Sequence, residues 1–129
     1  LESIYWLAVL HKRDGVFPEI LPQWTPYEIE DGGMSYEDAL DYLLKIISAG
    51  DEWTFQTQIM IKPGYRIRSI AGLITNFHQP NSTLLCLVSA CLESGGHDQT
   101  WKDLYDVALN EQYRFLSYGD GCLIELKTS

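Results

Sequence analysis

The sequence of 129 residues has little positive charge and no long apolar run. Nine Lys and Arg residues stand against eighteen Asp and Glu residues, which gives a formal net charge of −9. This excess of negative charge disfavours the binding of nucleic acid by bulk electrostatics, because the phosphate backbone is itself anionic. Any contact of this chain with nucleic acid must therefore be local, or must lie in another segment.

Cysteine and clustered metal ligands are also scarce. The three cysteines are an odd number without C-x-x-C spacing, which predicts neither a disulfide framework nor a thiolate zinc site. His11 and His97 have no companion ligands at metal spacing, so we expect no metal. A Walker-type phosphate loop and the G-x-G-x-x-G motif are missing as well. A reducing compartment is expected, and the familiar nucleotide cradles are excluded.

No apolar run approaches the roughly 20 residues that a membrane-spanning helix needs, and no signal-peptide pattern opens the sequence. We therefore expect a cytoplasmic protein without a membrane partner. The sequence starts at Leu1 without an initiator Met and enters an apolar segment at once, whereas natural termini are commonly polar. This start suggests an excised fragment of a longer protein.

The apolar fraction of 46% can supply the core of one compact domain over residues 1–129. Hydrophobic periodicity and turn residues predict a mixed α/β fold with a mixed sheet, buried helices and amphipathic helices, without a strand order. The expected helices are 1–13, 35–47, 83–92 and 101–113. The expected strands are a short one at 27–29, a hairpin of 54–61 with 65–70, and one at 122–126. Residues 73–75 are either another strand or the continuation of 65–70.

The first candidate site is the polar loop of residues 76–81, which enters the N-terminus of the apolar helix 83–92. Unpaired backbone N–H groups, the positive end of the helix dipole and the hydroxyls of Ser82 and Thr83 can hold an anion there. In the alternative, Ser82 only caps its own helix and His78 is an ordinary loop histidine. The residues alone favour this alternative.

The second candidate site is the segment 113–120, where rings, hydroxyls, an Arg and an Asp crowd between a helix end and a strand. Rings can stack on a nucleobase, while Arg114 and Asp120 can hydrogen-bond to a nucleoside. Alternatively, the rings pack on the core and Arg114 pairs with Asp120 within the protein. The residues alone do not decide between the two.

Together, the segments 73–90 and 113–120 resemble the two C-terminal signatures of the S-adenosylmethionine:tRNA ribosyltransferase-isomerase family of queuosine biosynthesis. The turn at Pro63-Gly64-Tyr65 also matches the family pattern, and the resemblance is strongest from Pro63 to Ile124. It implies that the chain is the C-terminal part of the family's large domain. The rest of that domain and a small β-rich domain would then be absent.

The resemblance implies an enzyme that moves the ribosyl group of S-adenosylmethionine to a 7-aminomethyl-7-deazaguanine base at the tRNA wobble position, forming epoxyqueuosine. S-adenosylmethionine is then a substrate, tRNA the partner, and no metal is implied. His78 and Asp120 are the expected catalytic residues, with His78 as base or orienting group. The expected substrate-binding residues are Asn76, Phe77, Ser82, Thr83, Tyr113, Arg114, Phe115, Ser117, Tyr118 and Gly119.

Three positions depart from the family pattern: Ala71 replaces a usual Asp, Gln79 a Leu and Cys91 a Phe. Ala71 favours the alternative of a non-catalytic acidic interaction module, or a ligand-binding module, that keeps the family scaffold. The retained His78, Arg114 and Asp120 oppose it. If the chain is a fragment, it lacks segments that complete the pocket, and we expect little or no activity from it alone.

Overall fold

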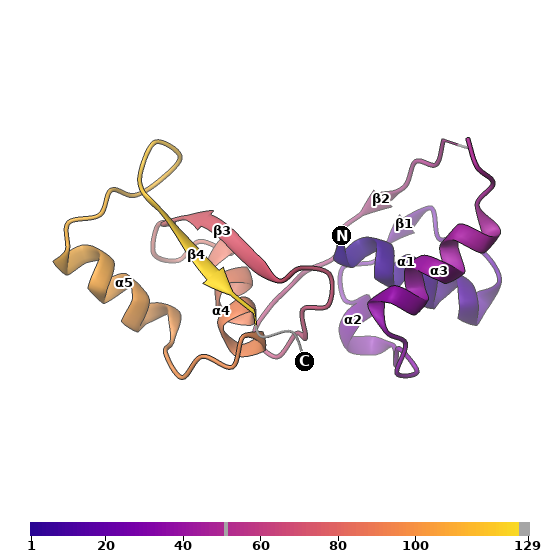
Figure 1. The fold of residues 1–129 in the computed structure, drawn as a ribbon, viewed down its shortest axis with the longest axis horizontal. Helices are drawn as coiled ribbons and strands as arrows, with labels where there is room; N and C mark the ends of the chain where they lie inside the picture. Colours follow the sequence, from indigo (N-terminus) through magenta and orange to yellow (C-terminus); the bar gives the residue numbers. More distant parts are fainter. Residues whose placement is uncertain (51, 127–129) are drawn as a thin grey trace. The chain divides into compact units, whose positions relative to one another are not determined.

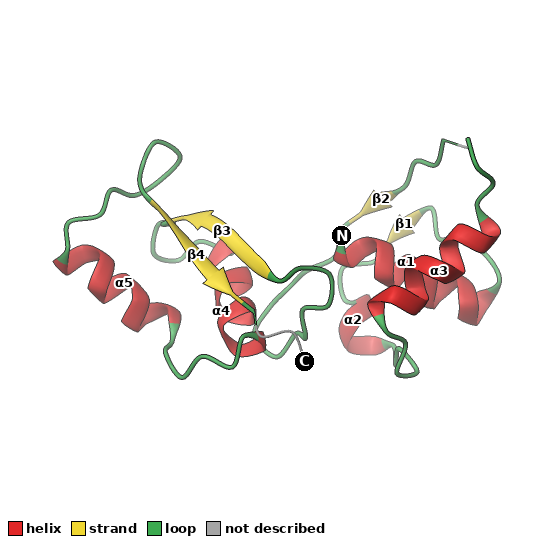
Figure 2. Cartoon of the chain, viewed as in Figure 1, coloured by secondary structure: helices red, strands yellow, loops and turns green. Residues whose placement is uncertain are grey.

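The computed structural model describes residues 1–50 and 52–126 and divides into two compact units, Leu1–Met60 and Ile61–Ser129. Each unit has its own helices and its own pair of strands (Figures 1 and 2). The predicted mixed α/β class is confirmed. That residues 1–129 form one domain stays a prediction.

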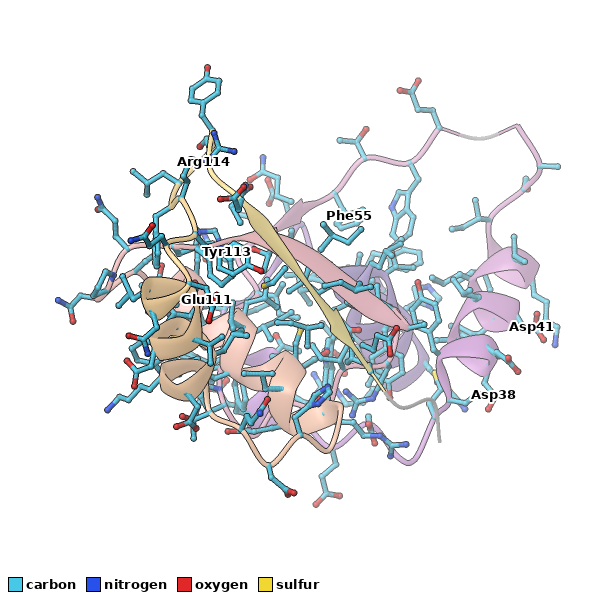
Figure 3. The ribbon with its side chains drawn as sticks, turned by 60° about the vertical axis from the view of Figure 1, so that its left-hand side comes forward. Asp38, Asp41, Phe55, Glu111, Tyr113 and Arg114 are labelled. Carbon is cyan, nitrogen blue, oxygen red and sulfur yellow. The ribbon has the colours of Figure 1, made fainter. Side chains whose placement is uncertain are left out.

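The first unit is built on two helices that pack against each other, α1 (Glu2–Asp14) and α3 (Tyr36–Ile46). α1 is buried over most of its length and ends at Gly15, which adopts the left-handed conformation common just after a helix. α3 begins with a capping box between Ser35 and Asp38, which satisfies backbone N–H groups of the first turn. Both helices confirm the sequence-based expectation. Asp38 and Asp41 project away from the ribbon of α3 (Figure 3).

The short strand expected at residues 27–29 is wrong. Residues Thr25–Glu28 instead form one helical turn, α2, with Pro26 in its first turn. Proline is favoured there because its fixed φ suits a helix and its missing N–H needs no partner. The strand of this segment lies earlier, at β1 (Ile20–Leu21).

The expected hairpin of 54–61 with 65–70 is also wrong. Within the first of these segments only β2 (Gln56–Thr57) is a strand, and it pairs in parallel with β1. Residues 65–70 contain no strand. The Ser94 hydroxyl takes the place of a partner strand, because it accepts from the Ile67 amide at 3.0 Å and donates to the Tyr65 carbonyl at 3.1 Å.

The second unit holds β3 (Gly72–Asn76), α4 (Leu84–Ser94), α5 (Trp101–Asn110) and β4 (Gly121–Glu125). β3 and β4 pair antiparallel and lie over α4, with α5 beside them (Figure 1). All four elements confirm the expectation with small changes of boundary. A second capping box, between Thr100 and Asp103, starts α5.

Two hydrophobic clusters form the core of the second unit. The first consists of Phe77, Leu85, Tyr105 and Ala108, and the second of Val88, Cys91, Leu92 and Ile124. α4 contributes to both clusters, as its apolar sequence predicts. It is not buried all round, because Leu84 in its first turn is half exposed. No helix within residues 1–50 and 52–126 is long and apolar enough to cross a membrane.

Candidate functional site

The pairing of β3 with β4 brings the two candidate segments of the sequence together. Asn76 and Gly121 form the last pair of the ladder, so the loops on either side of it start from the same point. Beyond that pair, the Phe77 amide donates to the Asp120 carbonyl at 3.4 Å, and the Leu116 amide donates to the Phe77 carbonyl at 2.8 Å. The loop after β3 and the loop before β4 are therefore one hydrogen-bonded structure.

A pocket of about 290 Å³ opens where these two loops meet. Its lining is Asn76, His78, Gln79, Ser82, Leu84, Leu116 and Ser117. Four of the residues expected from the sequence thus surround one cavity: Asn76, His78, Ser82 and Ser117. The contribution of Leu84 and Leu116 was not predictable from the sequence, because their apolar side chains resemble those of core residues.

Leu116 has a φ of 71°, a left-handed conformation that is uncommon for a bulky side chain. Two backbone bonds keep it there, one to the Phe77 carbonyl and one at 2.8 Å from the Gly119 amide to its own carbonyl. Conformations of this kind cost about 1–3 kcal/mol and cluster at ligand sites. Their occurrence here agrees with a functional role for the pocket.

His78 is half-buried and is held by two other residues. Its Nε2 lies 2.9 Å from the Thr75 hydroxyl, and its backbone N–H donates to the Tyr105 hydroxyl at 2.8 Å. Burial raises the pKa of Tyr105, so the phenol is neutral at pH 7. Thr75 and Tyr105 are functional candidates that the motifs did not reveal, because both look like ordinary strand and helix positions in the sequence.

An ion pair between Arg114 and Asp120 closes the loop that precedes β4. The Arg114 Nη2 donates to Asp120 Oδ1 at 3.1 Å, and the Arg114 backbone amide donates to Oδ2 at 2.8 Å. The Asp120 amide returns a bond to the Arg114 carbonyl at 2.8 Å. The Arg114 guanidinium is the main cause that lowers the pKa of Asp120 below its ordinary value. The internal ion pair, one of the two alternatives from the sequence, is therefore present.

Gly119 fits inside this closed loop because it has no side chain. A Cβ at this position would collide with the carbonyl of Arg114. The glycine allows the backbone to come close enough for the bonds between Arg114 and Asp120, while its expected role in substrate binding stays a prediction.

The aromatic residues of the two segments differ sharply in exposure. Phe77 is 3% exposed, and its ring lies between those of Tyr105, Tyr113 and Phe115 at centroid distances of 5.4, 5.6 and 5.5 Å. Phe77 is therefore a core residue, against which Phe115 is half-buried. Tyr113 is 46% exposed and follows the end of α5 with Arg114 (Figure 3), and Tyr118 is 98% exposed. Tyr113 and Tyr118 are therefore the exposed rings of these two segments.

The start of α4 provides fewer groups for binding an anion than the sequence predicted. Thr83 occupies the N-cap position without a side-chain bond to the helix, and it is absent from the pocket lining. Ser82 does line the pocket, and its hydroxyl accepts from the Leu84 amide at 3.3 Å. Within residues 1–50 and 52–126, no group of three or more His, Cys, Asp or Glu side chains is placed to hold a metal ion.

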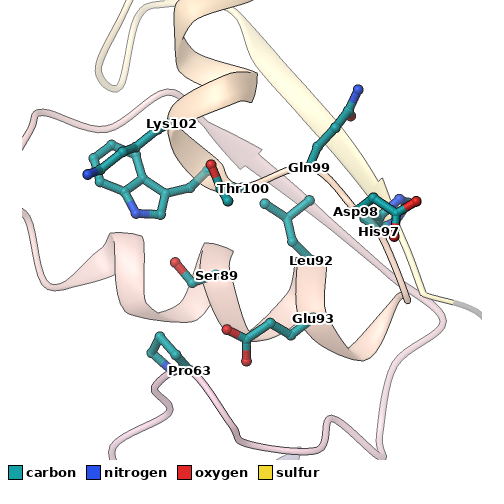
Figure 4. A pocket seen from close by; sticks show the side chains of 10 residues that line it. Pro63, Ser89, Leu92, Glu93, His97, Asp98, Gln99, Thr100 and Lys102 are labelled. Carbon is teal, nitrogen blue, oxygen red and sulfur yellow. The ribbon is translucent and has the colours of Figure 1, made fainter.

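A second pocket, of about 390 Å³, lies between the Pro63 turn, the C-terminal half of α4 and the start of α5 (Figure 4). Leu92 and Trp101 give it an apolar wall. The Glu93 carboxylate at its edge already accepts from the Gly64 amide at 2.6 Å. None of the expected site residues lines this pocket.

Comparison with known proteins agrees with the resemblance seen in the sequence. The family model described as "Queuosine biosynthesis protein" matches residues 36–124, which is more than half of the chain. The S-adenosylmethionine:tRNA ribosyltransferase-isomerase of Moorella thermoacetica is 52% identical over 79 residues, covering 61% of this chain and 21% of that protein. The protein of the same name from Gluconobacter oxydans is 48% identical over 73 residues, covering 57% of this chain and 20% of its own length.

A further relative comes from Parvibaculum lavamentivorans and has the same name, S-adenosylmethionine:tRNA ribosyltransferase-isomerase. It is 51% identical over 69 residues, which cover 54% of this chain and 19% of that protein. The chain thus spans about one fifth of the length of the relatives that it matches. No solved structure matches the chain. On the match of residues 36–124, the chain belongs to the queuosine biosynthesis protein family.

Proposed function

We propose that this chain is one part of an S-adenosylmethionine:tRNA ribosyltransferase-isomerase and forms one wall of its active site. Such an enzyme transfers the ribosyl group of S-adenosylmethionine to the aminomethyl group of a 7-deazaguanine base in tRNA and isomerises it, and adenine and methionine leave. The family match and the names of the relatives support the proposal. Because the chain covers only about one fifth of these relatives, further segments complete the site.

The observation that carries the proposal is the pocket at which both family segments meet. Asn76, His78 and Ser82 of the first segment lie far in the sequence from Leu116 and Ser117 of the second, yet all five line the same cavity. The backbone bond from Leu116 to Phe77 fixes this arrangement. A shared pocket is the geometry that two signatures of one active site require.

In this proposal His78 is the base or orienting group, because it is the titratable side chain that lines the pocket together with hydroxyl and amide groups. The reaction needs a base to remove the C5′ proton beside the sulfonium of S-adenosylmethionine. Asn76, Ser82 and Ser117 line the same cavity and provide hydrogen-bonding groups for the ribose or the methionine part. Thr83, exposed at the start of α4, joins Ser82 in holding an anionic group.

The closed loop of Arg114 and Asp120 presents the exposed rings of Tyr113 and Tyr118 for stacking on a base of the tRNA. The catalytic role of Asp120 stays a prediction. Its lowered pKa favours an ionised carboxylate that orients the loop and a ligand amine over a group that takes up a proton. Phe77 and Phe115 support the site from the core.

Ala71 does not touch this pocket. It precedes β3, whereas His78 follows that strand, and the five residues of β3 separate the two ends by roughly 17 Å. The Ala71 carbonyl accepts from the Leu126 amide at 2.8 Å, a bond that any residue provides. The replacement of the usual Asp therefore leaves the pocket intact, which argues against the alternative of a non-catalytic module.

We infer that this reaction takes place in the cytoplasm. The test is turnover of tRNA by the purified complete enzyme that contains this chain. Purified protein is incubated with S-adenosylmethionine and tRNA that carries the 7-aminomethyl-7-deazaguanine base. We expect adenine and methionine in equal amounts, together with epoxyqueuosine in the tRNA, and little or no product from residues 1–129 alone. Absence of adenine release by the complete enzyme, or efficient turnover by residues 1–129 alone, contradicts the proposal.

A further inference from the structure

Two residues outside the expected site hold His78 at both its ring and its backbone. We propose that Thr75 and Tyr105 are positioning residues for His78: Thr75 keeps the ring proton on Nε2, so that Nδ1 is the basic atom, and Tyr105 fixes the backbone of the loop. This inference rests on the proposed role of His78 in the pocket. Neither residue lines the pocket itself.

Thr75 lies in β3, opposite Cys122 of β4, so the antiparallel ladder fixes its backbone. Its hydroxyl donates to the Asn76 carbonyl at 3.3 Å and lies 2.9 Å from His78 Nε2. A hydroxyl has one hydrogen and two lone pairs. With the hydrogen given to Asn76, the hydroxyl oxygen accepts from Nε2–H, which leaves Nδ1 unprotonated in the neutral ring.

Tyr105 holds the backbone of His78. Its hydroxyl accepts from the His78 backbone N–H at 2.8 Å. The phenol cannot move easily, because it is 5% exposed and packs edge-on against Phe77 and Trp101 at centroid distances of 5.4 and 5.7 Å. Tyr105 of α5 thus places a fixed hydrogen-bond acceptor at His78, the residue that follows the buried Phe77.

The two contacts together leave His78 little freedom in its ring orientation or its backbone position. A catalytic side chain that is already oriented before the substrate arrives needs no reorganisation during the reaction. Removal of either hydroxyl should therefore loosen His78 while the pocket and the fold remain.

The first test is nitrogen-15 NMR of the histidine rings in the 129-residue chain, which has three histidines. The His78 signals are those that disappear in His78→Gln. At a pH where the ring is neutral, we expect Nε2 at the shift of a protonated nitrogen and Nδ1 at that of an unprotonated one. Thr75→Val should move the two shifts toward each other as both tautomers become populated, and Thr75→Ser should restore them.

A matched control is Thr54→Val, the same substitution at an exposed position of the other unit, which should leave the His78 shifts unchanged. If Thr75→Val does not fold, Thr75→Ala removes the same hydroxyl with a smaller side chain. A proton on Nδ1 in the parent chain, or His78 shifts that do not respond to loss of the hydroxyl, would overturn the assignment to Thr75.

The second test uses Tyr105→Phe, which keeps the ring and removes only the acceptor. We expect hydrogen exchange of the His78 amide to become about tenfold faster than in the parent chain, since one hydrogen bond is lost. Tyr42→Phe is the matched control, because it removes a hydroxyl 2.8 Å from the ring of another histidine, His11. It should change the His11 signals only.

Unchanged exchange of the His78 amide in Tyr105→Phe would overturn the role of Tyr105. These readouts need no substrate. If the complete enzyme shows no turnover, the NMR and exchange results can still be interpreted. If the NMR and exchange results contradict the roles of Thr75 and Tyr105, the turnover assay still tests the proposed function.

Discussion

Phe77 belongs to the family segment 73–90, yet the structure makes it a core residue, and Phe77→Ala tests this directly. The side chain is 3% exposed and touches three other rings. Truncation of a buried Phe to Ala costs about 3–5 kcal/mol, from lost burial and the cavity left behind. That is a large part of the total stability of a small unit. We expect Phe77→Ala to unfold or nearly unfold the unit that contains the pocket.

The measurement is a urea titration of the 129-residue chain, followed through the amide signals of β3 and α5. These signals report the second unit alone, which matters because two compact units need not unfold together. We expect the midpoint for Phe77→Ala to fall by about 1 M or more. Tyr118→Ala is the control: its ring is 98% exposed, so the change should stay within about 0.5 kcal/mol. Equal midpoints for Phe77→Ala and the parent would show that Phe77 does not hold the core of the second unit together.

Three further substitutions test the local interactions around the site. Asp120→Asn tests the ion pair: because the pKa of Asp120 is lowered, its carboxylate stabilises the fold above its ordinary pKa of 3.8 and loses this effect as the pH falls through the lowered value. The difference in urea midpoint between parent and Asp120→Asn should therefore close on acidification below pH 3.8, and a difference that persists would contradict the ion pair. Gly119→Ala should destabilise the second unit by about 1–3 kcal/mol in the same titration, since its Cβ collides with the Arg114 carbonyl; a neutral effect would show that the loop relaxes freely. Thr100→Ala removes the cap of α5 and should cost about 1 kcal/mol, with faster amide exchange confined to the first turn of that helix.

The helices whose ends are set by residues close together in the sequence were predicted correctly. Ser35 and Asp38 form a capping box at the start of a periodic apolar run, so α3 was predictable from residues that are neighbours in the chain. The same holds for Gly15 at the end of α1. β3 and β4 were predictable as strands, but their pairing was not, because no short-range pattern connects Thr75 with Cys122.

The expected hairpin is wrong because its first strand pairs with a distant segment of the chain. Alternation around Phe55 and Ile59 resembles a strand, but the partner of β2 is β1, more than thirty residues earlier in the chain. The segment after Pro63 is held by Ser94 of α4, a side chain whose role is invisible in the sequence. Tertiary hydrogen bonds of this kind override the local preference for a strand.

The candidate site was predictable in part. The two family segments identified Asn76, His78, Ser82 and Ser117, which the structure brings to one pocket. The residues that hold His78 were not predictable, because a strand threonine and a helix tyrosine carry no local sign of the contacts at 2.9 and 2.8 Å. The sequence did not distinguish the buried ring of Phe77 from the exposed rings of Tyr113 and Tyr118, because the burial of a side chain depends on the whole fold.

The proposed function requires the pocket around His78 to take part in ribosyl transfer. The most direct measurement is the rate of adenine release from S-adenosylmethionine by the complete enzyme with its tRNA substrate, compared between His78→Gln and His97→Gln. His97 is an exposed histidine whose ring nitrogen contacts the Glu125 carbonyl at 2.7 Å, outside that pocket. We expect a loss of at least about 100-fold for His78→Gln, the usual contribution of a general acid or base, and near-parent turnover for His97→Gln. Parent-like turnover by a folded His78→Gln enzyme would rule out a catalytic role for His78.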